Sequence, residues 1–123
     1  MISKETTVLN QAYQKEEVLM ETRETDFVLE SMEKGKYPLL MIHKESVVVG
    51  SMDIACNYIL REKGVSRMHA KLMKKPDGIF LLDLNSTNGT YLNGELIQSG
   101  EEYLLEEGDL VAFATCEFYV RLQ

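Results

Sequence analysis

The apolar residues after position 37 occur in short runs separated by polar turns, and no segment there keeps a helical period of 3.6 for long. Val, Ile, Tyr and Phe are concentrated in these runs, and such residues favour strands. Turn-forming sequences such as Lys75-Pro-Asp-Gly78, Asn93-Gly94 and Glu107-Gly-Asp109 divide them. The runs cover residues 38–42, 46–49, 58–60, 68–73, 79–82, 103–105, 110–113 and 117–122. This pattern predicts an all-β fold, either a sandwich or a barrel of short strands.

The first 35 residues have a different character. They contain no proline, and no glycine before Gly35, and they are rich in Glu, Thr and Gln. Their apolar residues fit one helical face only loosely. We therefore expect residues 1–35 to form an acidic tail or linker, either partly helical or disordered, ahead of one domain over residues 36–123.

Length and composition exclude several classes of protein. The 123 residues suffice for one hydrophobic core but not for two ordinary domains. No apolar run approaches the roughly 20 residues that span a bilayer, and no secretory signal precedes the domain, so we expect a cytoplasmic protein without membrane contact. Cys56 and Cys116 are far apart and have no histidine or CxxC at ligand spacing, which suggests neither zinc nor a disulfide framework.

The charge is unevenly distributed along the chain. The formal net charge of −7 argues against nucleic acid as a partner, because nucleic acids are held chiefly by basic faces. However, a basic segment runs from Arg61 to Lys75, with Glu62 as its one acid. The simplest interpretation of such a segment is a solvated face of strands and turns.

Two polar segments stand between the strand-like runs. Val65-Ser-Arg-Met-His-Ala70 lies inside the basic segment, and Asn85-Ser-Thr-Asn-Gly-Thr-Tyr-Leu-Asn-Gly94 follows Leu81-Leu-Asp-Leu84. Loops of this kind present hydroxyl and amide groups from a packed β-scaffold. They indicate a binding site for an anion.

These two segments, together with Gly50 and Asp83, closely resemble in order and spacing the signature blocks of the forkhead-associated (FHA) domain, in the form found in bacterial proteins. The resemblance covers roughly residues 37–123. It implies a two-sheet antiparallel β-sandwich whose loops at one end bind a phosphothreonine peptide. The protein would then be an adaptor in Ser/Thr kinase signalling, with a phosphothreonine-containing protein and a Ser/Thr kinase as its partners, no cofactor and no catalysis.

The resemblance also implies roles for individual residues. The serine at the position of Ser66 contacts the phosphate in the family, and the arginine at Arg67 often does so too. The threonine at Thr87 helps to hold the phosphothreonine, and the asparagine at Asn88 bonds the peptide main chain. A phosphothreonine carries about −1.5 to −2 charges and three acceptor oxygens, so convergent donors of these kinds suit it.

The remaining signature residues are expected to shape the site. The resemblance assigns Gly50 to a strand end and His69 to bracing the loops by hydrogen bonds, while Gly89, Asn93 and Gly94 suit positive φ angles in turns. A lone histidine without a partnered nucleophile is more often structural than catalytic. With no metal cluster or cofactor loop in the sequence either, an enzyme is the least favoured class.

The chain departs from the family after Gly50, where Ser51 replaces the usual arginine. We keep Ser51 among the expected peptide-contacting residues. Arg61 and Lys63 are candidates to supply the missing positive charge, because they lie just before Ser66. The alternative is a degenerate FHA module that mediates phosphate-independent protein interactions within a larger protein.

The acidic segment carries a second hypothesis. Glu5-Thr-Thr-Val-Leu9 resembles the phosphoacceptor segments in the N-terminal tails of some bacterial FHA proteins. If Thr6 or Thr7 is phosphorylated, the domain would bind its own tail at high effective concentration. Thr22 and Thr25 are weaker candidates of the same kind. The alternative is that this segment is only an acidic linker.

Overall fold

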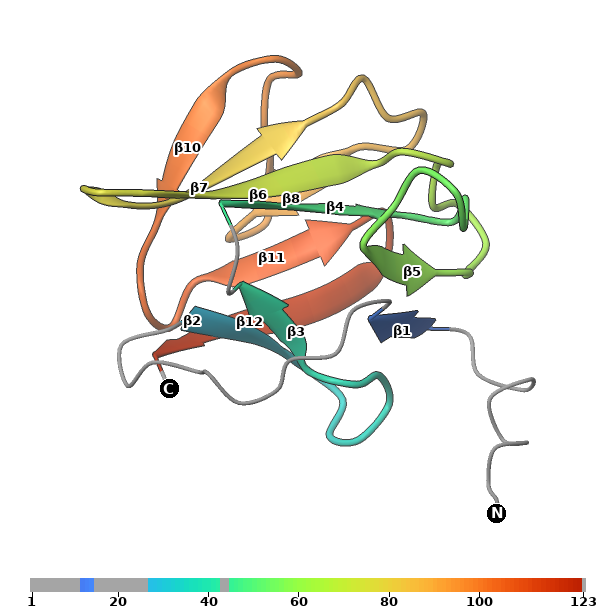
Figure 1. Cartoon of the computed structure of the whole chain (residues 1–123), viewed down its shortest axis with the longest axis horizontal. Helices are drawn as coiled ribbons and strands as arrows, with labels where there is room; N and C mark the ends of the chain where they lie inside the picture. The colour runs from blue at the N-terminus through green and yellow to red at the C-terminus, as the bar shows by residue number, and fades with distance from the viewer. Residues whose placement is uncertain (1–11, 15–26, 43–44, 123) are drawn as a thin grey trace.

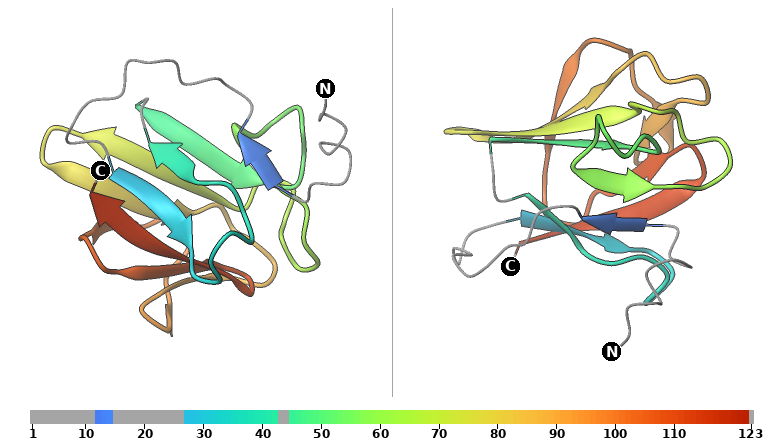
Figure 2. Two further views of the ribbon diagram at one scale, coloured as in Figure 1. Left: turned by 90° about the horizontal axis from the view of Figure 1, so that it is seen from below. Right: turned by 45° about the vertical axis from the view of Figure 1, so that its right-hand side comes forward.

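The computed structural model describes residues 12–14, 27–42 and 45–122. These residues form two six-stranded sheets that face each other across the hydrophobic core (Figures 1 and 2). All the described strand pairs are antiparallel except one, which is parallel. The predicted two-sheet β-sandwich is therefore confirmed.

Each sheet combines strands from distant parts of the chain. The first sheet has the order β1 (Ala12–Gln14), β5 (Tyr58–Leu60), β4 (Ser46–Gly50), β6 (Ala70–Lys75), β7 (Gly78–Asp83) and β10 (Glu102–Leu105). The second sheet has the order β3 (Leu40–Ile42), β2 (Phe27–Ser31), β12 (Cys116–Leu122), β11 (Leu110–Phe113), β8 (Thr90–Leu92) and β9 (Glu95–Leu96).

Alternation along the strands builds the core. In β7, Ile79, Leu81 and Asp83 are buried while the residues between them are partly exposed, as a sheet with one covered face requires. Four aromatic rings fill the space between the sheets. They belong to Tyr37, Tyr58, Phe113 and Phe118. The ring centroid of Phe118 lies 5.6 Å from that of Tyr37, 6.2 Å from that of Tyr58 and 5.7 Å from that of Phe113.

Two segments of the expected N-terminal tail belong to the sandwich, so the tail prediction is wrong for them. β2 lies between β12 and β3, and its Val28 and Leu29 are buried. β1 pairs with β5, and the side-chain amide of Gln14 both donates to the Met41 carbonyl (3.3 Å) and accepts from the Met41 amide (3.0 Å). Gln14 thereby links an edge of the first sheet to an edge of the second.

β4 and β5 form the parallel pair, and Gly50 ends β4 beside Ile59. A Cβ atom on Gly50 would lie 2.2 Å from the Arg67 carbonyl oxygen and 2.9 Å from the Cys56 sulfur. Only a residue without a side chain allows the strand end to approach the 66–67 backbone this closely.

Gly50→Ala is therefore expected to destabilise the fold by about 3 kcal/mol, since backbone atoms cannot move aside as a side chain can. Denaturant unfolding measures this loss. Gly94→Ala is the matched control, because Gly94 has free space around it and a φ of 86°, so only the dihedral cost of about 1 kcal/mol applies. Equal losses in both variants would contradict the steric explanation.

Candidate functional site

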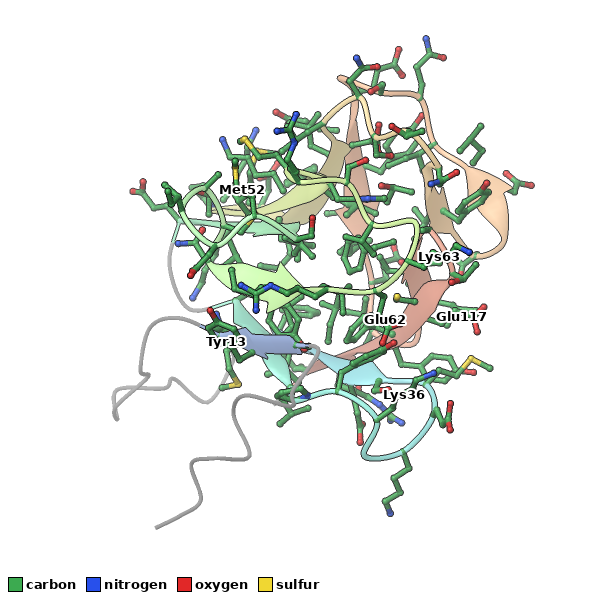
Figure 3. All side chains as sticks on the ribbon, turned by 90° about the vertical axis from the view of Figure 1, so that its right-hand side faces the viewer. Tyr13, Lys36, Met52, Glu62, Lys63 and Glu117 are labelled. Carbon is green, nitrogen blue, oxygen red and sulfur yellow. The ribbon has the colours of Figure 1, made fainter. Side chains whose placement is uncertain are left out.

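Three loops meet at one end of the sandwich, on the right in Figure 1 and facing the viewer in Figure 3. They connect β4 to β5, β5 to β6, and β7 to β8. The β4–β5 loop (the first) and the β5–β6 loop (the second) are joined by two main-chain hydrogen bonds. The Ser51 N–H donates to the Ser66 carbonyl (3.0 Å), and the Met52 N–H donates to the Arg67 carbonyl (3.2 Å). The Cys56 thiol also donates to the Arg67 carbonyl (3.0 Å).

His69 joins the second loop to the third from a fully buried position. Its Nδ1 accepts from the Ser66 N–H (3.0 Å), so Nε2 carries the ring proton and donates to the Gly89 carbonyl (2.9 Å). Its ring packs edge-on against Phe113. Burial lowers the pKa of His69 below its usual 6.5, and this outweighs the Gly89 carbonyl and the Asp83 charge, which raise it. His69 is therefore neutral, and both ring nitrogens are occupied.

Neutral His69 makes the stability pH-dependent. In the unfolded chain this histidine takes up a proton near its usual pKa of 6.5, whereas folded His69 resists protonation. The contribution of neutral His69 to the free energy of unfolding is therefore complete above that pH and is lost as the pH falls below 6.5. We expect the free energy of unfolding to decrease between about pH 7 and pH 5. His69→Gln should flatten this slope in urea titrations; a slope equal to that of the unaltered protein would refute the assignment.

Asp83 organises the third loop from its buried position at the end of β7. Its carboxylate accepts from the hydroxyl groups of Ser86 (2.6 Å), Thr90 (2.6 Å) and Ser99 (2.7 Å), and from the Ser86 N–H (3.1 Å). Burial by itself would raise the pKa of Asp83, but these hydrogen bonds together hold it below its usual value. The Ser86 hydroxyl in turn accepts from the Gly89 N–H (3.0 Å), which fixes the loop tip.

The loop tip presents Thr87 and Asn88 to solvent. The Thr87 N–H donates to the Ser66 hydroxyl oxygen (3.0 Å), and the Asn88 amide donates to the Gly64 carbonyl (3.0 Å). Each contact ties the third loop to the second. Since the Ser66 oxygen acts as an acceptor for Thr87, its own proton remains available to a ligand.

A hollow of about 570 Å³ lies between these loops. Its lining residues are Met52, Val65, Ser66, Arg67, Met68, Asn85 and Thr87, and we call it the Ser66 groove. Among the described residues, the Arg67 side chain has no ion pair or hydrogen bond, and it is exposed. The groove therefore combines a free guanidinium, a serine hydroxyl and a threonine hydroxyl.

The structure brings only some of the predicted binding residues into this groove. Ser66, Arg67 and Thr87 line it, whereas Asn88 lies in the adjoining hollow beyond Thr87, and Ser51 lies at the end of β4 without lining either. The threonines proposed as phosphoacceptors, Thr6 and Thr7 with the weaker Thr22 and Thr25, lie outside the described residues.

The two candidate substitute bases also lie outside the groove lining. The Arg61 guanidinium lies over the Tyr13 ring of β1, 5.8 Å from its centroid. Lys63 lies on the side of this end opposite Met52, toward Glu117 (Figure 3). Neither position supplies charge directly to the groove.

The predicted turn residues adopt the expected backbone. Asn93 and Gly94 have φ angles of 52° and 86° in the β8–β9 hairpin, and Gly89 has a φ of 89°. The Asn93 side chain also donates to Asp109 (3.1 Å) and accepts from the Leu110 N–H (2.9 Å). Asn85, with a φ of 59°, is a further left-handed residue that sequence reasoning missed, although asparagine tolerates this conformation best among residues with a side chain.

A family model described as the FHA domain matches residues 47–114, more than half of the chain, and this range includes Gly50, the Ser66 groove and the Asp83 network. The chain belongs to the FHA-domain family. Members of this family are interaction modules, and the resemblance stated from the sequence is confirmed.

Individual FHA proteins agree with this assignment. The chain is 31% identical over 91 residues to the FHA domain-containing protein FhaA of Mycobacterium tuberculosis, covering 74% of this chain and 16% of FhaA. It is 34% identical over 76 residues to the probable serine/threonine-protein kinase fhkC of Dictyostelium discoideum, covering 58% of this chain and 13% of the kinase. The chain thus spans under a fifth of these curated relatives.

A solved structure supports the fold. It comes from a structural and functional analysis of phosphothreonine-dependent FHA domain interactions, and it matches with a TM-score of 0.71 and 29% identity over 80% of this chain and 98% of that chain. In the described part of this FHA domain, no group of His, Cys, Asp and Glu could hold a metal ion, and no helix is long and apolar enough to cross a membrane.

Proposed function

We propose that this FHA domain binds phosphothreonine peptides as an adaptor in Ser/Thr kinase signalling. Ser66, Arg67 and Thr87 contact the phosphothreonine, and Asn88 contacts the peptide main chain. The observation that carries the proposal is the Ser66 groove itself: the Thr87 N–H holds the Ser66 hydroxyl oxygen at 3.0 Å, beside the free Arg67 guanidinium. A dianionic phosphate needs such convergent donors, one of them charged.

The arrangement is also preorganised. His69 and Asp83 are saturated with internal hydrogen bonds, so they hold the loops without competing for the ligand. Donors fixed before binding lose less conformational entropy when the ligand arrives, which favours affinity. The Arg67 guanidinium and the Ser66 and Thr87 hydroxyl protons remain available in the groove, and these are the donors that the proposal assigns to the phosphate.

Calorimetric titration of the full chain with paired peptides tests the proposal. A phosphothreonine peptide library should bind, while the same library with unphosphorylated threonine should bind at least about 100-fold more weakly, since several charge-assisted hydrogen bonds are lost. A phosphoserine library tests whether the threonine methyl group contributes. Equal binding of the phosphorylated and unphosphorylated libraries would overturn the proposal.

Ser51 favours the alternative of a phosphate-independent docking module, because the usual arginine is absent there. Ser51→Arg distinguishes the two functions. If the domain reads phosphate, a guanidinium at the end of β4 adds a charge-assisted contact, and the phosphopeptide affinity should rise about tenfold. Ser51→Gln is the uncharged control. An unchanged affinity for the phosphopeptide, with binding of unphosphorylated protein intact, would favour the degenerate module.

The position of β1 supports a finer proposal, in which the domain binds its own phosphorylated Thr6 or Thr7. β1 runs antiparallel to β5, so Ala12 pairs with Leu60 at the end where β5 leads toward Ser66. Three strand spacings, from β1 through β5 and β4 to residue 66, amount to about 14 Å. The five residues from Thr7 to Ala12 can extend about 17 Å, which is sufficient.

Phosphorylating the chain at Thr7 tests this self-docking. An external phosphothreonine peptide should then bind at least about tenfold more weakly, because the tethered ligand competes at high effective concentration. Thr7→Val treated with the same kinase is the control. Undiminished binding by the Thr7-phosphorylated chain would exclude self-docking and leave the binding function intact.

A further inference from the structure

The outer face of the first sheet carries a row of apolar side chains that the protein leaves partly exposed. Met73, Phe80 and Leu104 lie directly opposite one another on the adjacent strands β6, β7 and β10. Leu104 is 47% exposed, and the other two are partly exposed. The residue before Met73 and the residue after Phe80, Leu72 and Leu81, are buried in the core. The three side chains therefore point away from the core and form an apolar row about 10 Å wide.

The next row on this face contains a positive charge without a partner. Val48, Lys71 and Leu82 lie opposite one another on β4, β6 and β7, so Lys71 stands between two apolar side chains. Lys71 is partly buried, and within the described part of the chain its ammonium has no ion pair or hydrogen bond. Lys75, on the same side of β6, pairs with Glu102 at 2.6 Å. Two lysines thus stand against one glutamate on this face, although the formal net charge of the chain is −7.

Arg121, on the outer face of the second sheet, shows how a cation on a strand is balanced elsewhere in this domain. Its guanidinium lies 3.3 Å from the Glu30 carboxylate and 5.9 Å from the centroid of the Tyr119 ring. Lys71 has neither a carboxylate nor an aromatic ring of this kind beside it. An acidic group brought by another molecule would complete its surroundings.

We infer that this face is a docking surface for an amphipathic helix of a partner protein, with one Glu or Asp inside the apolar stripe of the helix. The apolar stripe packs on the row from Met73 to Leu104, and the acidic residue pairs with Lys71. Helices commonly cover an apolar sheet face. Four strands span about 14 Å, which a helix of about ten residues crosses. We call this surface the Lys71 face, and it consists of Val48, Lys71, Met73, Phe80, Leu82 and Leu104.

The Lys71 face is separate from the Ser66 groove. None of its six residues lines the groove, and the contact with the helix involves no phosphate. The inference therefore goes beyond the proposed function, and each of the two can fail without the other.

A display library of unphosphorylated helical peptides of about 14 residues, about 21 Å long, tests the Lys71 face on the full chain. One face of each helix is randomised among Leu, Met, Phe, Ser, Glu and Lys. The selected peptides should carry Glu with apolar residues three or four positions away, and Lys should be depleted at the position of this Glu. They should bind at least about tenfold more weakly to Lys71→Glu, because attraction becomes repulsion, and about three- to tenfold more weakly to Leu104→Ser.

Two further variants make the result specific to this face. Lys34→Glu reverses the same charge at an exposed position in the connection between β2 and β3, and it should bind the selected peptides within about twofold of the unaltered chain. Lys71→Gln removes the charge without reversing it and should give a smaller loss than Lys71→Glu, which also covers the case that the reversed charge disturbs folding.

The outcomes keep the docking surface and the proposed function apart. A library that yields no enriched peptide, or peptides whose binding is unchanged by both Lys71 substitutions, overturns the inference. An equal loss of binding in Lys34→Glu does so too. Phosphothreonine peptides titrated against Leu104→Ser should bind within about twofold of the unaltered chain, and a matching loss there would show that the Lys71 face is not a separate surface. Failure of the unaltered chain to bind phosphothreonine peptides overturns the proposed function alone.

Discussion

Replacing Arg67 with alanine is expected to weaken the binding of a phosphothreonine peptide by about 10- to 150-fold, because a hydrogen bond to a charged group is worth about 1.5–3 kcal/mol. Ser66→Ala removes one neutral donor to the same phosphate and should lie near the lower end of this range. Titration calorimetry with a fixed phosphopeptide gives both values. The unphosphorylated peptide should show no difference between the proteins.

Arg61→Ala is the matched control, since it removes the same charge where the guanidinium lies over Tyr13, outside the groove lining. The peptide affinity of this variant should change by less than about twofold, because Arg61 does not line the groove and physiological salt screens exposed charges that make no direct contact. Arg67 is exposed, so its removal should leave the unfolding free energy within about 0.5 kcal/mol. A loss of affinity in Arg61→Ala equal to that in Arg67→Ala would refute a specific phosphate contact.

The strands with a clear apolar run could be predicted from the sequence. Tyr58–Leu60 and Leu110–Phe113 have the bounds expected from their runs of apolar residues. The expected strand over residues 68–73 begins instead at Ala70, because Met68 faces the groove and the signature residues before it form the loop. Apolar character alone did not distinguish a core methionine from an exposed one that lines the groove.

The strands within the first 35 residues could not be predicted in this way. β1 has only three residues, and its position depends on pairing with Leu60 and on the link from Gln14 to Met41. β2 follows an acidic stretch and is held by β12, more than 80 residues away along the chain. Such pairing is decided by tertiary contacts, to which local composition is insensitive.

The inner network of the site was only partly accessible from the sequence. The bracing role of His69 followed from the family resemblance, and its two hydrogen bonds to Ser66 and Gly89 agree with it. Asp83 was noted only as part of the signature, and Ser99 was missed, because it reaches Asp83 from a loop beyond the β8–β9 hairpin. The Asp-x-x-Ser spacing to Ser86 was the available signal, as Asp side chains often bond the backbone of such turns.

The site therefore has two layers with different roles. Buried His69 and Asp83 make their hydrogen bonds within the protein, while the exposed side chains of Arg67 and Thr87 face solvent, where the proposed function assigns them to the ligand. Substitutions in the outer layer should alter affinity at constant stability. Substitutions in the inner layer should alter stability first, and affinity as a consequence.

Asp83→Ala is expected to show this most strongly, with a loss of about 4 kcal/mol in the free energy of unfolding. The substitution leaves the hydroxyls of Ser86 and Thr90 without their carboxylate acceptor, and it leaves Ser99 only the longer contact to the main-chain carbonyl of residue 83 (3.4 Å). Thr90 is fully buried, so water cannot replace the carboxylate there. Native stability is only about 5–15 kcal/mol, which makes this a large share of the total. Since the chain has no tryptophan, urea unfolding is best followed by far-ultraviolet circular dichroism.

Two comparisons make the Asp83 prediction specific. Asp83→Asn keeps one acceptor oxygen and should lose less, while Glu101→Ala, an exposed acid, should change stability by no more than about 0.5 kcal/mol. The hydrogen bonds hold the pKa of folded Asp83 below its usual 3.8, so its contribution is present above that pH and is lost as the pH falls through the folded value. The difference in unfolding free energy between the unaltered protein and Asp83→Ala should therefore become smaller in acid. A gap that stays constant from neutral pH to well below pH 3.8 would show that the carboxylate charge does not hold this loop.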